Sequence, residues 1–307
     1  MDKKNINIIG YDSGWGCLNF GCEDGPDNLS IDKIRLKLKE QGIEVEWNGS
    51  LGLKSLASHD KITTKEGALP FVVKGLEELA HKIYETTKEN KIPVVIGGDH
   101  SSAIGTWSGI TTALDTCQKF GMIWLDAHMD AHTPDTADEG KWGGWWHGMP
   151  VASLIGSGLP EFTNLISSTP KLSADHVSLI GIRSYEHGED EFLKGNNIRV
   201  YLMDEVYERG FNDIFKVALE RATTGTDGFG ISIDLDAFDP KDAPGVGTQE
   251  KDGLRSAEVL PVISGLAYHP LFKGIEIAEY NPHNDRDKKT LHLIENIIFS
   301  LFSTSSD

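Results

Sequence analysis

The chain contains few cysteines and no pair of them at close spacing. Its 307 residues include only Cys17, Cys22 and Cys117, and no C-x-x-C motif occurs. Three separated cysteines argue against a disulfide framework and against a cysteine-rich zinc site. They are typical of free thiols in a reducing compartment, so we expect a cytoplasmic location.

Basic residues and long apolar segments are also scarce. The sequence has 29 Lys and Arg against 47 Asp and Glu, a formal net charge of −18. A nucleic-acid-binding protein normally presents a basic face, so we expect no nucleic-acid partner. No run of about 18 apolar residues occurs, and the N-terminal segment lacks the apolar region of a signal peptide, so we expect no membrane partner.

The apolar runs that are present are short and alternate with amphipathic segments. We predict strands at residues 5–11, 92–98, 121–127, 176–182, 199–203, 228–236 and 272–280. Helical spacing separates most of them, at residues 29–42, 66–90, 101–116, 211–223, 256–267 and 288–302. Strands that are apolar on both faces and alternate with helices predict a mainly parallel sheet covered on both sides. No linker or repeat interrupts this pattern, so we predict a single three-layer α/β/α domain over residues 1–307.

Polar residues stand where three of the predicted strands end. In sheets of this kind, ligands collect at the carboxyl ends of the strands. The stretches are VVIGGDHS with Asp99 and His100, MIWLDAHMD with Asp126, His128 and Asp130, and ISIDLDAFD with Asp234, Asp236 and Asp239.

The spacing of these residues indicates a shared direction. In an extended strand, Asp126, His128 and Asp130 would point to one face, as would Asp234 and Asp236. Carboxylates gathered in this way repel one another and lose hydration unless a cation neutralises them. Carboxylate and imidazole ligands suit Mn²⁺, and other divalent ions remain open, whereas the absence of cysteine ligands argues against structural zinc.

Six candidate ligands are more than one catalytic metal needs, and they suit a binuclear site in which an aspartate bridges the two ions. The predicted ligands are His100, Asp126, His128, Asp130, Asp234 and Asp236. An isolated aspartate at a strand end usually caps a helix or lies in a turn, and only the combined D-x-H-x-D and D-x-D patterns favour metal binding. We expect Asp99 to orient a ligand imidazole, and Asp239 to lie in a turn or behind the ligands.

These motifs resemble those of the arginase family, the ureohydrolases. The resemblance implies an arginase-like α/β fold, two Mn²⁺ ions per subunit on the six predicted ligands, and a metal-bridging hydroxide that attacks a guanidinium or amidine carbon. It also implies a homo-oligomer, either a trimer or a hexamer. The matching stretches are GGDHS (97–101), DAHMDAHTP (126–134), HGMP (147–150), SIDLDAFDP (232–240) and EYNP (279–282).

The same resemblance implies three catalytic residues. His147 would transfer a proton near the leaving amine, Glu279 would pair with the planar guanidinium, and Asp130 would act as both ligand and catalytic group. Imidazole titrates near neutral pH, and a carboxylate accepts parallel hydrogen bonds from a guanidinium, so the chemistry fits. Without the metal motifs, His147 would be interpreted as a packed histidine and Glu279 as a surface residue.

The substrate-binding side departs from the arginase pattern. Arginases carry S-G-N just before the histidine, whereas this chain has GKWGGWWHGMP (140–150), with Trp142, Trp145 and Trp146. The tryptophans would line a reshaped pocket, stack on a cationic group or pack the loop down. Where arginases carry an asparagine after the last ligand of the D-x-H-x-D motif, this chain has a histidine. The residues that we predict to bind substrate are His132, Trp146, Glu186, Glu189 and Thr248.

The sequence therefore predicts a metal-dependent hydrolase acting on C–N bonds of linear amidines, with a small guanidino or amidine substrate. The arginase-type reaction, L-arginine to L-ornithine and urea, is the leading prediction. Formimidoylglutamase, agmatinase and other guanidino hydrolases are alternatives within the family. Outside that chemistry stand a non-catalytic metal-binding homologue, which would have lost a ligand or His147, and a deacetylase with one zinc ion and fewer ligands.

Overall fold

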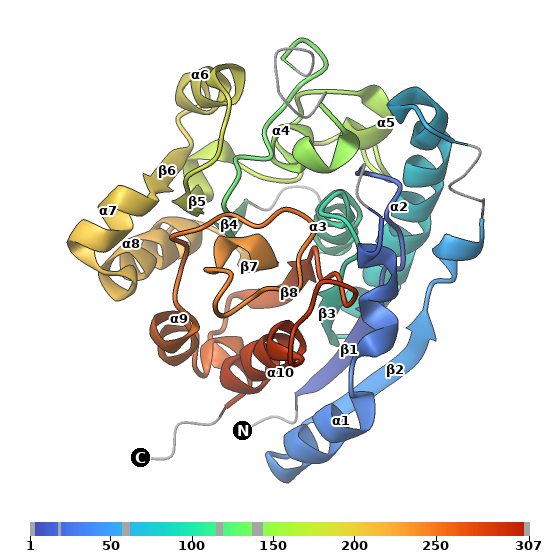
Figure 1. Ribbon diagram of the computed structural model, residues 1–307, viewed down its shortest axis with the longest axis vertical. Coiled ribbons are helices and arrows are strands. Elements are labelled where there is room, and N and C mark those ends of the chain that lie inside the picture. Colours follow the sequence, from blue (N-terminus) through green and yellow to red (C-terminus); the bar gives the residue numbers. More distant parts are fainter. Residues whose placement is uncertain (1–3, 18–19, 57–61, 115–118, 137–143, 304–307) are drawn as a thin grey trace.

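The computed structural model describes residues 4–17, 20–56, 62–114, 119–136 and 144–303 (Figure 1). One eight-stranded sheet forms its centre, and every pair of neighbouring strands is parallel. The predicted parallel sheet is thus confirmed. In spatial order the strands are β2 (Glu44–Ser50), β1 (Asn5–Gly10), β3 (Ile92–Ile96), β8 (Phe272–Ala278), β7 (Gly228–Asp234), β4 (Phe120–Leu125), β5 (Val177–Ile182) and β6 (Arg199–Leu202).

The inner strands are buried on both faces because their side chains alternate between two apolar cores. Ile123 and Leu125 of β4 enter one core, whereas Met122 and Trp124 of the same strand enter the other. Successive side chains of a strand point to opposite faces, so a run without polar residues requires cover on both. The sequence of β4 therefore places this strand inside a layered fold.

Helices cover the two faces of the sheet and complete the predicted three layers (Figure 1). On one face lie α1 (Ile31–Glu40), α7 (Met203–Arg209), α8 (Phe211–Thr223), α9 (Ser256–Val262) and α10 (Lys289–Leu301). On the other lie α2 (Lys65–Lys88), α3 (Ser102–Ala113), α4 (Pro150–Leu154), α5 (Pro160–Thr163) and α6 (His187–Gly195).

Two glycines fix the position of α3, whose N-terminal end lies next to the candidate site. A Cβ at Gly109 would stand 2.6 Å from the carbonyl oxygen of Ala80 in α2. A Cβ at Gly230 of β7 would stand 2.1 Å from the ring of Trp107 in α3. Only glycine allows both approaches, so α3 packs tightly against α2 and against the sheet.

The edge of the sheet differs from the prediction. Strand β2 and the short helices α4 to α7 are additional to the predicted elements. Strand β2 carries Glu44 and Glu46 and is only half-buried, so it lacks the apolar run by which the inner strands are found. Pairing with β1 makes it a strand despite this composition.

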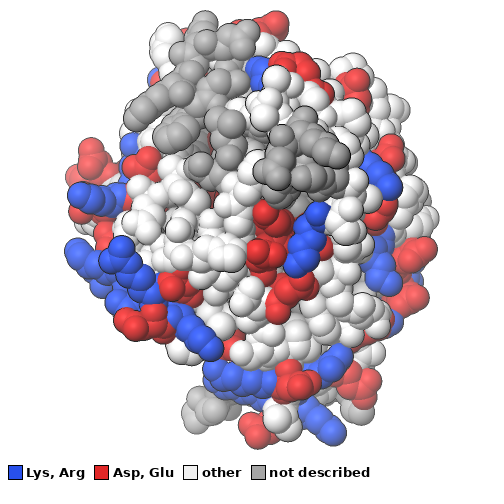
Figure 2. All heavy atoms as spheres, turned by 45° about the vertical axis from the view of Figure 1, so that its right-hand side comes forward, with Lys and Arg blue, Asp and Glu red and all other residues white. Residues whose placement is uncertain are grey.

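On the face shown in Figure 2, lysine and arginine side chains are interspersed with aspartate and glutamate, and the described residues form no continuous basic surface there. None of the helices within the described ranges is both long and apolar enough to cross a lipid bilayer.

Candidate active site

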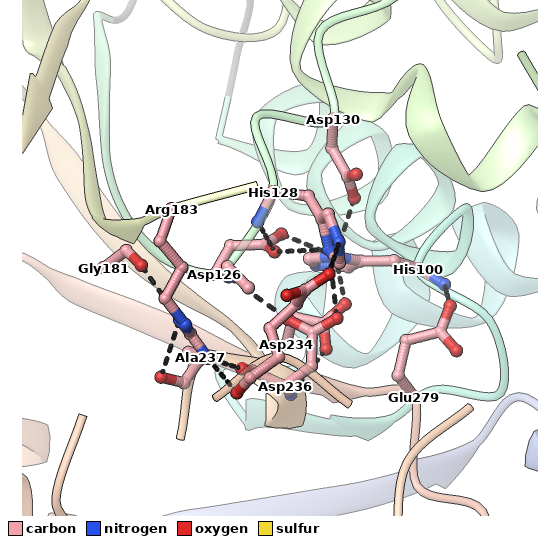
Figure 3. A network of polar contacts seen from close by, with 12 residues as sticks. His100, Asp126, His128, Asp130, Gly181, Arg183, Asp234, Asp236, Ala237 and Glu279 are labelled. Carbon is pink, nitrogen blue, oxygen red and sulfur yellow. Dashed lines mark hydrogen bonds and ion pairs between the residues drawn. The ribbon is translucent and has the colours of Figure 1, made fainter. Parts of the chain in front are cut away.

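The candidate site lies at the carboxyl ends of the four central strands, β3, β8, β7 and β4, which are neighbours in the sheet. His100 follows β3, residues 126–130 follow β4, residues 234–236 lie at the end of β7, and Glu279 follows β8. Because the four strands are parallel, these segments meet at one edge of the sheet (Figure 3). Segments far apart in the sequence are thereby brought together.

The geometry of the two aspartate motifs differs from the prediction, because neither motif continues an extended strand. Strand β4 ends before Asp126, and Asp130 has a left-handed backbone with φ of 47°. The Oδ1 atom of Asp126 accepts the N–H of His128 at 2.7 Å, and that of Asp234 accepts the N–H of Asp236 at 2.8 Å. The ligands converge because these aspartates hydrogen-bond to the backbone two residues on and bend the chain.

All six predicted ligands are brought together, in two groups that share Asp126. Within each group the candidate ligand atoms lie within 4.8 Å of one another. Figure 3 shows the side chains pointing toward one another. The first group is His100, Asp126, Asp130 and Asp234, and the second is Asp126, His128 and Asp236.

The first group fits a divalent cation. The fully buried Nδ1 atom of His100 lies 3.0 Å from an oxygen of Asp130 and 3.1 Å from one of Asp234, yet it has no partner in hydrogen-bonding geometry. A nitrogen lone pair that faces several carboxylates is repelled unless a cation lies between them. Imidazole and carboxylate donors together suit Mn²⁺ and related ions.

Burial and neighbouring carboxylates disfavour the charged form of two carboxyls in this cluster, Asp130 and Asp234. Burial and the charge of Asp126 together raise the pKa of Asp130 to about 7. Burial and the charge of Asp236 raise the pKa of Asp234 well above its usual range. At His128, burial alone would lower the pKa, but Asp236 and its neighbours outweigh burial and raise it. Ionising all the carboxylates therefore requires additional positive charge.

Behind His100 lies a polar network that sequence reasoning missed. The Nε2 atom of His100 lies 3.0 Å from the hydroxyl of Ser232 and 3.5 Å from Oε2 of Glu276, a fully buried carboxylate on β8. Ser102 donates to the other oxygen of Glu276 at 2.5 Å. A glutamate inside an apolar strand was the available sequence signal, because a charge at such a position needs partners.

Asp99 and Asp239 bind the backbone rather than the ligands. Asp99 accepts the N–H groups of Gly16 at 2.8 Å and Ser101 at 3.0 Å. The prediction that it orients the His100 imidazole is therefore wrong, because Ser232 and Glu276 occupy that place. Asp239 accepts two backbone N–H groups of the loop around it, in agreement with the predicted turn role.

His147 and Glu279 form a pair beside the metal cluster. The Nδ1 atom of His147 lies 3.2 Å from Oε1 of Glu279, which also accepts the backbone N–H of His100 at 3.0 Å. Glu279 has φ of 65°, and its own N–H donates to the carbonyl of Gly98. Burial would lower the pKa of His147, but the hydrogen bond and charge of Glu279 outweigh burial and raise it. The pKa of Glu279 is lowered, because its contact with His147 outweighs burial.

A cavity of about 260 Å³ opens onto both the cluster and this pair. Most of the predicted catalytic and substrate-binding residues line this cavity and form its wall. The lining residues include His128, Asp130, His132, Trp145, His147, Tyr185, Glu186, Glu189, Asp234, Asp236, Thr248 and Glu279.

Within this wall, His132, Glu186 and Glu189 form a third group. The Nε2 atom of His132 lies 2.8 Å from Oε2 of Glu186 and 3.5 Å from Oε2 of Glu189. Glu189 also accepts the N–H of Ala131 at 3.0 Å and that of Glu186 at 3.2 Å. Glu189 thus ties the segment that follows the candidate ligand Asp130 to the beginning of α6.

The tryptophans of the loop have different environments. Trp145 lines the cavity, whereas Trp146 is 6% exposed and lies in the apolar core. The indole N–H of Trp146 donates to the carbonyl of Lys65 at 2.7 Å, and its ring meets Phe162 edge-on. Trp146 packs the loop against the core and is not among the described residues that line the cavity. Trp142 lies outside the described residues, as does Cys117, whereas Cys17 and Cys22 are buried and are not joined by a disulfide.

A single guanidinium, also missed from the sequence, holds the turn that carries Asp236. Arg183 donates to the carbonyls of Asp236 at 2.6 Å and Ala237 at 3.3 Å (Figure 3). It also donates to the carbonyls of Glu250 at 2.8 Å and Lys251 at 2.9 Å. Nothing in the spacing of GIRS distinguishes this arginine from one at the surface.

A cavity over a carboxylate–imidazole cluster, at the carboxyl edge of a parallel sheet, is typical of metal-dependent enzymes with a layered α/β fold. A model of the arginase family matches residues 4–303. The chain belongs to the arginase family, whose members are hydrolases that act on guanidino C–N bonds.

Individual relatives agree with this assignment. An arginase of Bacillus caldovelox is 33% identical over 300 residues, covering 97% of this chain and 98% of that protein. The crystal structure of an arginase from Bacillus cereus superimposes with a TM-score of 0.88 at 31% identity, covering 99% of this chain and all of that one. A formimidoylglutamase from Bacillus subtilis shares the fold, with a TM-score of 0.74 at 23% identity over 98% of this chain and 86% of that one.

Proposed function

We propose that the protein hydrolyses L-arginine to L-ornithine and urea. The observation that carries this proposal is the cavity lined by both ligand groups and by the His147–Glu279 pair. The relatives named arginase, which align over nearly the whole chain, support the same reaction.

We propose that the two ligand groups would hold two Mn²⁺ ions, with Asp126 as a member of both groups. When bound, such ions lower the pKa of water and polarise the reacting group, which supplies a nucleophile at neutral pH. The carboxylates of both groups supply the negative charge that holds the ions. We assign Asp130 a second task, receiving the proton of the attacking water, because its carboxylate also lines the cavity.

Glu279 is the proposed partner of the guanidinium. Its carboxylate lines the cavity, and its lowered pKa keeps it ionised at neutral pH. An ionised carboxylate accepts charge-assisted hydrogen bonds from the planar donors of a guanidinium. The backbone N–H of His100 fixes one oxygen of Glu279, so the carboxylate meets the substrate in one orientation.

His147 is the proposed proton donor to the leaving amine. Despite burial, Glu279 raises the pKa of the His147 imidazole and so favours its protonated form, and the place of His147 in the cavity wall puts that proton next to the substrate. The backbone N–H of His147 donates to the carbonyl of Gly16 at 2.8 Å, which holds the loop at this position.

The tail of the substrate is proposed to meet His132, Glu186, Glu189 and Thr248, all in the cavity wall. The acidic side chains attract the α-ammonium of arginine. Trp146 supports this wall from the core. A substrate without an α-carboxylate, such as agmatine, is a second candidate. It is favoured because no lysine, arginine, asparagine or glutamine is among the described residues that line the cavity.

A substrate panel on the Mn²⁺-loaded protein tests the proposal. Arginine, agmatine, 4-guanidinobutyrate and formimidoylglutamate are supplied separately, and urea and formamide are measured. We expect urea from arginine or agmatine. The variant Asp126→Asn should lose both metal and activity because Asp126 belongs to both groups, whereas the exposed Glu258→Gln should lose neither. A protein that holds two ions and releases no product would refute the proposal, and a single ion would refute the binuclear site.

We also propose that residues 1–307 form one catalytic domain, because all eight strands belong to one sheet. We propose a cytoplasmic protein, which is supported by the low number of cysteines, three in 307 residues, and by the lack of a disulfide between Cys17 and Cys22. The family resemblance supports a homo-oligomer, either a trimer or a hexamer, and gel filtration with light scattering measures it.

A further inference from the structure

The six candidate ligands differ in how firmly packing holds them. The side chain of His128 is 23% exposed, whereas each of the other five is at most 10% exposed. A partly exposed imidazole rotates unless another contact restrains it. Rotation of the ring would carry Nδ1 away from Asp126 and Asp236, so His128 needs a restraint that burial supplies to the other ligands.

Glu250 stands on the far side of the His128 ring. Its Oε1 atom lies 3.8 Å from Nε2, while Nδ1 lies 3.0 Å from Oδ2 of Asp236 and 3.6 Å from Oδ1 of Asp126. A carboxylate facing Nε2 favours the tautomer that carries its proton there. The lone pair of Nδ1 then points at the ligand group, as a metal ligand requires.

Arg183 holds the backbone of Glu250 close to the turn that carries Asp236. The guanidinium of Arg183 donates both to the carbonyls of Glu250 and Lys251 and to those of Asp236 and Ala237. Figure 3 shows Arg183 reaching the turn that carries Asp236. Because a guanidinium is planar and rigid, it sets the distance between the two segments. The side chain of Arg183 therefore holds both the backbone of Glu250 and the turn that carries the candidate ligand Asp236.

The other ligand imidazole has a comparable partner. His100 presents Nδ1 to its carboxylates and Nε2 to Ser232 and the buried Glu276. We propose that Glu250 is a positioning residue for His128, which orients the ring so that Nδ1 binds metal. This inference rests on the proposed metal centre, and it adds a residue outside the six ligands and outside the cavity wall.

Titration of the metal-free, full-length protein with Mn²⁺ by calorimetry tests the inference. The proteins compared are the wild type, Glu250→Ala, Glu250→Gln and the matched control Glu258→Ala, which changes an exposed glutamate on α9. Loss of such a partner typically weakens metal binding about 10- to 100-fold. We expect Glu250→Ala to weaken one of the two binding steps at least about tenfold, and Glu250→Gln, which keeps an acceptor oxygen, to weaken it less. The control should bind as the wild type does.

The other binding step should stay within about twofold, because His128 belongs to only one ligand group. Unchanged binding in Glu250→Ala, or equal weakening of both steps, would overturn the inference. The wild type separates this inference from the proposed function. A wild type that binds two ions without releasing urea contradicts only the reaction, whereas an active wild type with unaffected Glu250→Ala contradicts only the role of Glu250.

Discussion

Replacing Glu279 with glutamine tests the proposed recognition of the guanidinium most directly. The substitution keeps the shape of the side chain and one acceptor oxygen, but it removes the charge and adds an N–H₂ donor. In the buried pair, the retained oxygen still serves the N–H of His100, so the new donor faces the donors of the substrate. A hydrogen bond to a charged group contributes about 1.5–3 kcal/mol, and an unpaired buried donor adds to the loss.

We therefore expect a loss of about 3 kcal/mol of transition-state stabilisation, which is about 150-fold in kcat/KM. The assay is urea release over a range of arginine concentrations at saturating Mn²⁺, with metal content measured in parallel. Glu279 belongs to neither ligand group, so the variant should keep its metal. The exposed Glu258→Gln serves as control. A variant with full metal content and kcat/KM within about fivefold of the wild type would refute the role of Glu279.

Four further predictions follow from the same contacts. His147→Asn should lower kcat about 100-fold. In the wild type, kcat should fall as pH rises through the pKa of His147, which is raised by Glu279. The pH profile of the variant should lack this fall in kcat. Removing metal with a chelator should lower Tm by roughly 4 °C for each ion lost, because an ion at 100 times its Kd adds about 2.7 kcal/mol, and calorimetry showing no shift would contradict a specific site. His132→Ala should raise KM for arginine without changing metal affinity, since it removes a side chain that is proposed to contact the substrate tail and that pairs with Glu186, and an unchanged KM would contradict this. Gly230→Ala should lower the free energy of unfolding by about 1–3 kcal/mol in urea denaturation, because its Cβ meets the Trp107 ring; an equally stable variant would show that the ring can move.

The inner sheet was predictable because β3, β4, β7 and β8 are apolar runs of ordinary strand length. The edge strand β2 was not, because its sequence EVEWNGS carries charge and acquires strand geometry by pairing with β1. Predicted bounds extended past the real strand ends at residues 126–127 and 235–236. Each of these two pairs contains an apolar residue that extends the apolar run of the strand in the sequence. In the structure, Asp126 and Asp234 accept hydrogen bonds from the backbone two residues on, and the chain bends there.

The clustering of the six candidate ligands was predictable from residue types at strand ends, but the side chains converge through turns rather than along extended strands. The residues that orient the ligands were harder to find, since their roles depend on contacts between distant segments. Glu276 reaches His100 across 176 positions of the sequence, and Arg183 reaches carbonyls 53 to 68 positions away. Trp146 illustrates the same limit, because the sequence shows an aromatic residue beside the proposed catalytic histidine but not which way the ring packs.

Strand β8 is the last strand along the described residues, yet it lies between β3 and β7 in the middle of the sheet. Until residues 272–278 are in place, β3 has no neighbour toward β7, and the halves of the sheet that carry His100 and the aspartates of β4 and β7 are not joined. During synthesis, the two ligand groups therefore assemble only after nearly the whole chain has been made. Premature termination before β8 leaves separate halves with exposed apolar edges, a form without hydrolytic activity that is prone to aggregation.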